Sequence, residues 1–396
     1  MAFPDGRSPT PMIPYDDRIE ASLVPFRAFL NAIPADGHTV VLCHFDADGL
    51  AAGALFGRGL PLVVPGRVTV VPSLRDESAF SASARERLRA LQPDALVVTD
   101  LGVNEAGTLE ADVGPLGGPV PGLYVDHHRP RGLPAGGLVV SGYDWEPVPC
   151  SAWLAYSLLE AVVPDVDEMR TLDWIAALGV LSDLGDKAPW PPLADAKRRH
   201  TARWLKEATV LVNAARRGAT FRADEALALL LDVDGPRDLA ESPAAAPLHA
   251  ARAEVAAAMA EARKRAPVFS TRDAAVPEDV RPDGLRFALV TVDTPCQVHP
   301  LVAQQWRTRL PGYAVVCANT GYLPGTVAFS TRTSRADVVL PALYQSIDTP
   351  GWNGRWGQGH DQASGGHLPP AVFNDVLDAL GFEPGAHVDA AHEPGA

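Results

Sequence analysis

The sequence is poor in cysteine and has no long hydrophobic run. Its four cysteines stand at positions 43, 150, 296 and 317, and none of them forms a C-x-x-C pair. This spacing argues against a zinc ribbon, a redox dithiol or a disulfide framework. No stretch of about 18 apolar residues is present, so no membrane span is expected. The first 17 residues also lack the basic region and apolar core of a secretory signal. Together these features predict a reducing, cytoplasmic location.

Basic residues are also in deficit. The 396-residue chain has 48 acidic residues against 34 basic ones, and its formal net charge is −14. Such a charge argues against holding long duplex DNA by overall attraction, although a local cleft can still bind a short nucleic acid. Hydrophobic residues make up 47% of the chain and charged residues 21%, which is typical of a folded globular protein. The length predicts two to three domains.

Short apolar runs alternate with helical patterns in the first half of the chain. Strands are expected at residues 39–43, 67–72, 95–99 and 122–125, and helices at 18–33, 50–56, 81–91, 151–162 and 171–181. Continuous apolar strands that alternate with helices indicate a parallel sheet covered on both faces. The expected fold is therefore α/β, with an N-terminal doubly wound parallel sheet.

The second half of the chain differs from the first in composition and in its pattern of predicted elements. Residues 188–266 are rich in Ala, Arg and Leu and predict a helical connector. Strands return at 287–292, 313–318 and 326–331, with helices at 338–345 and 370–380, which predict a smaller C-terminal α/β domain. The expected domains are 1–187, 188–266 and 267–382, followed by a flexible tail at 383–396.

Acidic and imidazole side chains recur where the predicted strands end. His44, Asp46 and Asp48 follow the first strand as H-x-D-x-D-G; the other members are Asp100, Asp126, His127, His128 and Asp183. A single Asp at a strand end is usually a turn or helix-cap residue, so the order and number of these groups carry the interpretation. In an open parallel sheet, the carboxyl ends of adjacent strands line one crevice where ligands bind.

Carboxylates crowded in one crevice repel one another, and two divalent cations would balance four of them. Asp and His ligands without thiolate favour Mn²⁺, with Mg²⁺, Co²⁺ or Zn²⁺ as alternatives. A pair of metal ions about 3.5–4 Å apart suits in-line displacement at phosphorus.

The segments VLCHFDADGLAAG, VVTDLGVN, YVDHHRP and GVLSDLGD resemble motifs I to IV of the DHH phosphoesterase superfamily, in the same order, over residues 40–187. That superfamily includes RecJ-like exonucleases, short-oligonucleotide RNases, cyclic-dinucleotide phosphodiesterases and family II pyrophosphatases. The resemblance implies that His44, Asp46 and Asp100 hold one Mn²⁺. It implies that Asp48, Asp100, His127 and Asp183 hold the other, with Asp100 bridging. It further implies that Asp126 orients the neighbouring histidines and that His128 faces the substrate phosphate.

The C-terminal part is similar to the DHHA1 domain of the same superfamily. VAFSTRTS resembles its S-x-R-S strand and makes Arg332 a candidate phosphate ligand. QASGGHLPP resembles its G-G-G-H turn and makes Gly365, Gly366 and His367 candidates for substrate contact. The segment departs from the family pattern at Ser364, at Thr333 and at the Leu-Pro-Pro run after His367.

The resemblance implies metal-dependent hydrolysis of short single-stranded RNA or DNA, or of linear dinucleotides, to nucleoside monophosphates. The sequence shows no five-strand OB pattern after residue 382, which favours short substrates over long processive ones. Open alternatives are a RecJ-like single-stranded DNA exonuclease, a phosphatase for 3′-phosphoadenosine 5′-phosphate (pAp), a cyclic-dinucleotide phosphodiesterase, an inorganic pyrophosphatase and a non-catalytic binding protein.

Overall fold

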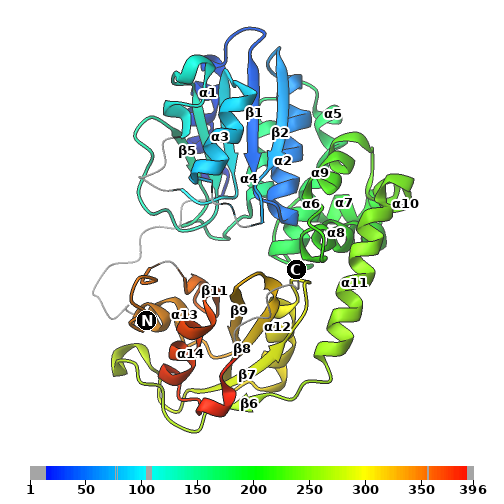
Figure 1. Ribbon diagram of the computed structural model, residues 1–396. Coiled ribbons are helices and arrows are strands. Elements are labelled where there is room, and N and C mark those ends of the chain that lie inside the picture. The colour runs from blue at the N-terminus through cyan, green and yellow to red at the C-terminus, as the bar shows by residue number, and fades with distance from the viewer. Residues whose placement is uncertain (1–14, 76, 78, 104–108, 355, 390–396) are drawn as a thin grey trace, which may run out of the picture. The chain divides into compact units, whose positions relative to one another are not determined.

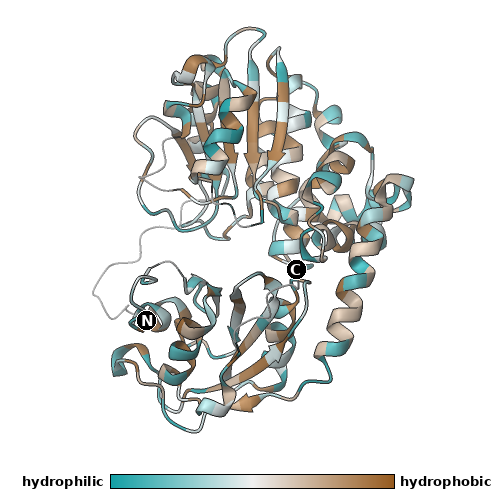
Figure 2. Ribbon diagram, in the orientation of Figure 1, coloured by the Kyte–Doolittle hydropathy of each residue, from teal (hydrophilic) through white to brown (hydrophobic). Residues whose placement is uncertain are grey.

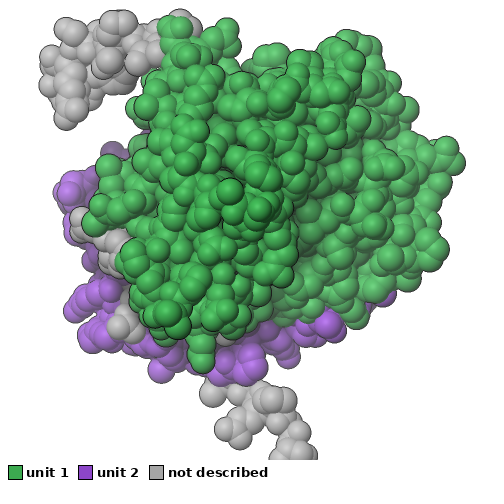
Figure 3. Space-filling model, turned by 90° about the horizontal axis from the view of Figure 1, so that it is seen from above, with its two compact units in different colours: residues 1–216, 221–249 green, residues 217–220, 250–396 purple. Residues whose placement is uncertain are grey.

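The computed structural model describes residues 15–75, 77, 79–103, 109–354 and 356–389. The chain divides into two compact units, which Figure 3 distinguishes by colour. The first comprises residues 1–216 and 221–249, and the second comprises residues 217–220 and 250–396. Of the predicted tail, residues 390–396 lie outside the described residues.

The first unit is built on a five-stranded parallel sheet (Figure 1). Its strands are β1 (His38–Cys43), β2 (Arg67–Pro72), β3 (Ala95–Thr99), β4 (Gly122–Asp126) and β5 (Leu138–Ser141). The order across the sheet is β2-β1-β3-β4-β5, and every neighbouring pair is parallel. The carboxyl ends of β1, β3 and β4 therefore lie side by side, because these three strands are consecutive in the sheet.

Helices cover both faces of this sheet, because successive side chains of each strand point to opposite faces. Val41 and Cys43 belong to a core shared with α1 (Tyr15–Ala32), α2 (Ala47–Gly59), α4 (Ser151–Glu160) and α6 (Asp173–Asp183). Val40 and Leu42 belong to a second core shared with α3 (Ala82–Leu91). The hydropathy colouring shows the central strands as mostly apolar (Figure 2), and the predicted doubly wound α/β fold is confirmed.

Further helices extend the larger of these cores. They are α5 (Val166–Arg170), α7 (Leu193–His200), α8 (Ala202–Arg217), α9 (Ala223–Asp232) and α10 (Pro236–Glu241). Leu193, Leu205 and Leu239 are buried in the same core as α2 and α4. Most of the segment predicted as a connector, 188–266, thus packs within the first unit. The next helix, α11 (Ala246–Ala262), contains residues of both units.

The second unit contains a six-stranded mixed sheet of order β10-β11-β9-β8-β7-β6. Its strands are β6 (Val268–Phe269), β7 (Arg286–Val292), β8 (Tyr313–Leu323), β9 (Thr326–Thr333), β10 (Gln358–His360) and β11 (Ala363–Leu368). Only β7 and β8 pair in parallel. One face packs on α12 (His299–Arg309) and the other on α13 (Leu340–Gln345) and α14 (Pro370–Ala379). The predicted smaller α/β domain is confirmed.

Among the helices of the described residues, none combines the length and apolar character that crossing a bilayer requires.

Candidate metal centre

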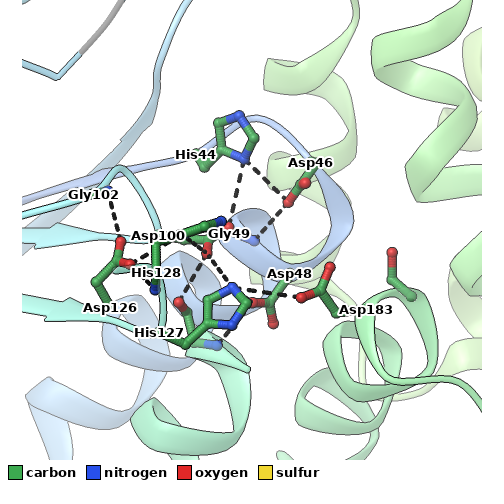
Figure 4. Close-up of polar contacts among 12 residues, drawn as sticks. His44, Asp46, Asp48, Gly49, Asp100, Gly102, Asp126, His127, His128 and Asp183 are labelled. Carbon is green, nitrogen blue, oxygen red and sulfur yellow. Dashed lines mark hydrogen bonds and ion pairs between the residues drawn. The ribbon is translucent and has the colours of Figure 1, made fainter. Parts of the chain in front are cut away.

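The eight candidate residues of the first unit lie together where β1, β3 and β4 end, beside the end of α6 (Figure 4). Side chains that are far apart in the sequence face one another there, as the crevice at the carboxyl ends of parallel strands predicts. The residues brought together are His44, Asp46, Asp48, Asp100, Asp126, His127, His128 and Asp183.

The loop after β1 places His44 and Asp46. Asp46 is the N-cap of α2, and its side chain accepts a hydrogen bond from the Gly49 N–H at 3.1 Å. Gly49 must lack a side chain, because a Cβ there would come within 2.5 Å of the His44 Cβ. The His44 Nδ1 lies 3.3 Å from Asp46 Oδ1 and 3.5 Å from Asp100 Oδ2.

Asp100 occupies the position directly after β3, in a left-handed backbone conformation with φ of 62°. Asp tolerates this conformation better than most residues do. Its backbone N–H bonds the Val125 carbonyl at 3.1 Å, which ties it to the neighbouring strand β4. Its carboxylate is almost fully buried, and its Oδ1 accepts a hydrogen bond from Ser151 Oγ at 2.9 Å.

Asp48 lies in the first turn of α2 and is buried. Its two oxygens accept hydrogen bonds from the backbone N–H groups of Ser151 at 2.8 Å and Ala152 at 3.0 Å, at the start of α4. A helix N-terminus stabilises a carboxylate through these free N–H groups and its dipole. These contacts fix the Asp48 carboxylate at the base of the site.

One imidazole nitrogen faces three carboxylates. His127 Nε2 lies 3.4 Å from Asp100 Oδ1, 3.5 Å from Asp183 Oδ2 and 4.0 Å from Asp48 Oδ2. Burial alone would lower the pKa of His127, but the hydrogen bond and charge of Asp100, with the charges of Asp48 and Asp183, raise it to about 10. Burial opposes protonation of His44 in the same way, but the contacts with Asp46 and Asp100 outweigh it and raise the pKa of His44 to about 10.

The pKa values of the four carboxyl groups shift in opposite directions: two are raised and two are lowered. Burial and the charges of Asp100 and Asp183 raise the pKa of Asp48 well above its ordinary value. Burial and nearby charge, above all that of Asp46, raise the pKa of Asp183 to about 6. For Asp100, the close imidazoles of His127 and His44 outweigh burial and lower the pKa to about 2. For Asp46, the neighbouring His44 outweighs burial, and the pKa lies well below its ordinary value. Excess negative charge in a buried site is the setting that a bound cation relieves.

Asp126 contacts the loop after β3 and the ring of His128. Its Oδ2 accepts a hydrogen bond from the Gly102 N–H at 2.7 Å, and its Oδ1 accepts one from the His128 N–H at 2.6 Å. The His128 Nδ1 lies 3.0 Å from the same Oδ1, and the His128 side chain is 44% exposed. Burial opposes protonation of His128, but the bond to Asp126 and the charge of Asp100 raise its pKa.

The donor atoms fall into three groups, each compact enough to surround one ion. The groups are His44, Asp46 and Asp100; Asp48, His127 and Asp183; and Asp100, His127 and His128. The first two are those expected from the motifs, except that the second is formed here without Asp100. The third adds His128, which the resemblance places toward substrate. The buried His44 Nδ1 has no hydrogen-bond partner in the site, although two carboxylate oxygens face it. Such an atom fits a metal ligand, and nitrogen and carboxylate donors suit Mn²⁺ or Mg²⁺.

Three of the four candidate residues of the second unit share one face of its sheet. Arg332 on β9 pairs in register with Ala363 on β11, and His367 pairs with Ala328. Arg332, Gly365 and His367 therefore point to the face that α12 covers, whereas Gly366 points to the opposite face. Arg332 is half-buried and its Nη1 donates to the Thr331 carbonyl at 3.0 Å. Burial and the nearby Arg307 lower its pKa to about 10, so the guanidinium stays charged at neutral pH.

The glycines of this segment lie in strand β11, not in the turn that the motif suggests. The physical reason is close packing, against β9 for Gly365 and against Trp356 for Gly366. A Cβ at Gly365 would come within 2.4 Å of the Phe329 carbonyl oxygen, and one at Gly366 within 3.0 Å of the Trp356 Cβ. His367 is exposed on the same strand.

Sequence reasoning missed three residues that shape the metal centre. Ser151 contacts both Asp48 and Asp100, and nothing in its local sequence marks it. Arg216 lowers the pKa of Asp46 from the end of α8. Gly179 lets α6 approach α2, because a Cβ there would lie 2.6 Å from Asp48 Oδ1. A glycine inside an apolar helical pattern was the available signal for the last of these.

Compared by sequence, the chain matches no protein-family model and no curated protein. Compared by structure, it matches a crystal structure of exonuclease RecJ bound to manganese with a TM-score of 0.62 and 21% identity, over 94% of this chain and 95% of that one. RecJ from Thermus thermophilus in complex with Mn²⁺ matches with a TM-score of 0.61 and 20% identity, over 97% of this chain. The chain spans only 57% of that protein.

A DHH domain described as belonging to a family of ribosomal proteins matches with a TM-score of 0.64 and 14% identity, over 92% of this chain and 90% of that one. These similarities confirm the fold expected from the four motifs and the DHHA1-like segment.

Proposed function

We propose that this chain is a metal-dependent phosphoesterase of the DHH type, which hydrolyses short single-stranded RNA or DNA to nucleoside monophosphates. The observation that carries the proposal is the convergence of Asp46, Asp48, Asp100 and Asp183 with His44 and His127 at the carboxyl edge of a parallel sheet. A structural role alone does not explain four carboxylates that repel one another within one crowded site. The solved proteins of this fold include one named exonuclease RecJ bound to manganese.

We assign two Mn²⁺ ions to the centre, with Mg²⁺ or Co²⁺ as substitutes. His44, Asp46 and Asp100 would hold one ion; Asp48, Asp100, His127 and Asp183 would hold the other. Burial raises the pKa of both nearby thiols, Cys43 and Cys150, so they stay protonated and do not compete as soft ligands. When bound, the ions would neutralise the carboxylates and activate the attacking water.

The protein's own residues would then position the substrate and move a proton. Asp126 holds the His128 ring through its Nδ1, and the His128 side chain would act on the leaving oxygen or a phosphate oxygen. The pKa of His128 is raised, which favours the protonated imidazole that a proton donor or a phosphate ligand needs. In the second unit, Arg332, Gly365, Gly366 and His367 are the proposed substrate contacts, with the arginine as the phosphate ligand.

The two alternatives that the same site supports are a RecJ-like single-stranded DNA exonuclease and a phosphoesterase for pAp or cyclic dinucleotides. Each uses the same metal centre and differs in what the second unit holds. A cytoplasmic location stays part of the proposal, and its support is the sparse, unpaired cysteine content of the sequence.

A time course with Mn²⁺ tests the proposal. Wild-type protein would be incubated with 5′- and 3′-labelled RNA and DNA of 2 to 30 nucleotides, and with pAp and a cyclic dinucleotide. Stepwise loss of nucleotides from the short oligomers supports the proposal. Turnover of pAp or the cyclic dinucleotide alone would identify those compounds as the substrates in place of oligonucleotides. Absence of turnover of every substrate would refute the proposed phosphoesterase function.

A further inference from the structure

Lysine is rare in this protein and unevenly placed. Only four of its 34 basic residues are lysines, at positions 187, 197, 206 and 264. Three of the four surround Asp186, an exposed residue just beyond α6, and these three (Lys187, Lys197 and Lys206) are called the lysine cluster below.

Lys197 on α7 makes the direct contact with Asp186. Its Nζ lies 2.8 Å from the Asp186 carboxylate and donates to the Asp186 carbonyl at 2.7 Å. Lys187 follows Asp186 in the chain, and Lys206 approaches from α8. The hydrogen bond from Lys197 is the main cause of a lowered Asp186 pKa, and the charges of Lys206 and Lys187 add to it. One carboxylate thus stands among three ammonium groups, so the cluster carries excess positive charge.

Lys187 and Lys206 are exposed, and neither forms a hydrogen bond or an ion pair within the part of the chain that the structure describes. Lys264 shows the ordinary alternative, because it pairs with Glu261 at 2.6 Å on the surface of the second unit. In a chain with a net charge of −14, two exposed ammonium groups that face the same carboxylate, Asp186, yet form no ion pair within the described residues are an unusual surface feature.

The lysine cluster adjoins the metal centre along two elements. Asp186 is three residues beyond Asp183, the candidate ligand that ends α6. On α8, Asn213 is buried and its Nδ2 donates to Ser182 Oγ at 2.9 Å, next to the same ligand. Lys206 precedes Asn213 by seven residues, so the two share a helix face and lie about 10 Å apart along the axis. The cluster therefore lies beyond the reach of the reacting phosphate but within reach of a connected one.

We infer that the lysine cluster binds backbone phosphates of nucleotides beyond the one being cleaved, and so gives the enzyme its preference for oligomers over dinucleotides. This inference rests on the proposed function. Ammonium groups on flexible stems bind phosphate as point charges without a fixed geometry, which suits a strand that must move after each cleavage. The phosphates of the strand would supply the ion pairs that Lys187 and Lys206 do not form within the described residues.

The test compares wild-type protein with a K187A/K206A variant, which keeps Lys197 to hold Asp186 in place. The matched control is K264A, and K187R/K206R restores the charge. The kcat and KM values are measured with Mn²⁺ on a labelled single-stranded dodecanucleotide and a labelled dinucleotide, over 50 to 200 mM salt. Melting curves check that each variant is folded.

For the dodecanucleotide, we expect the double alanine variant to raise KM about tenfold and to reduce the slope of log KM against log salt by about 1.4, since each lost single-strand phosphate contact removes about 0.7. The dinucleotide kinetics, K264A and K187R/K206R should stay near wild type. An unchanged salt slope, or an equal loss on both substrates, would overturn the inference while wild-type cleavage leaves the proposed function standing. Wild-type protein that cleaves neither substrate would overturn the proposed function and this inference with it.

Discussion

Replacing Asp100 by asparagine is expected to disturb both proposed ion sites at once, because this carboxylate faces both histidines of the centre. The Asp100 carboxylate faces His44 Nδ1 at 3.5 Å and His127 Nε2 at 3.4 Å, and it contributes to two of the three donor groups. Asparagine keeps the size of the side chain and tolerates the φ of 62° found at this position. The substitution therefore removes a charge while it preserves the backbone.

The magnitude follows from Coulomb's law. A unit charge about 4 Å from another contributes on the order of 4 kcal/mol at an effective dielectric constant near 20. That free energy corresponds to about a thousandfold in affinity. We therefore expect D100N to weaken Mn²⁺ binding by about a thousandfold and to reduce hydrolysis by at least as much.

Calorimetric titration with Mn²⁺ and the oligonucleotide time course measure the two effects. The matched control is D94N, because Asp94 precedes the same strand β3 and bonds the His38 N–H at its opposite end. D94N should bind Mn²⁺ and cleave like wild type. A folded D100N protein that retains more than about a tenth of the wild-type affinity and activity would refute the assignment of Asp100 to the metal centre.

Three further predictions concern the residues around the ions. Arg332→Ala should raise KM about tenfold and leave kcat within a few-fold, because the guanidinium binds phosphate without touching the reacting atoms; an unchanged KM removes it from the site. Asp126→Asn should lower kcat by roughly 10- to 100-fold and shift the basic limb of the pH–rate profile to lower pH, because the bond that raises the His128 pKa is lost; an unshifted limb contradicts this role. Metal-free protein should lose stability as pH rises from about 6.5 to about 10, because His44 and His127 bind protons more tightly in the folded state. Melting temperatures measured in chelator across this pH range test the prediction, and a melting temperature that does not change with pH would contradict it.

Much of the first unit follows from its sequence because its strands are continuous apolar runs. The strand expected at residues 67–72 coincides with β2, and that expected at 95–99 coincides with β3. β3 is buried in the interior of the sheet, whereas β2 is a partly buried edge strand, and both are continuous apolar runs that end at polar or Pro-containing segments. The strand β5, at the opposite edge of the sheet, was not expected, because its apolar run is shorter: four residues against six in β2.

The convergence of the candidate residues was also predictable, because most of them lie at or just after the end of a predicted strand, and Asp183 ends a helix. The contacts that hold them in place were not. Ser151 reaches Asp100 across 51 positions of the chain, through the packing of α4 beside the sheet. In the second unit, the glycines at 365 and 366 suggested a turn, but a close strand partner explains them equally well. A single sequence does not distinguish these two uses of glycine.

The most direct test of the whole account is a crystal structure of the protein soaked with Mn²⁺, with anomalous data collected at the manganese edge. The account predicts two anomalous peaks, one among His44, Asp46 and Asp100 and one among Asp48, His127 and Asp183, with Asp100 between them. The absence of both peaks at saturating Mn²⁺, or a manganese ion bound elsewhere in the chain, would contradict it.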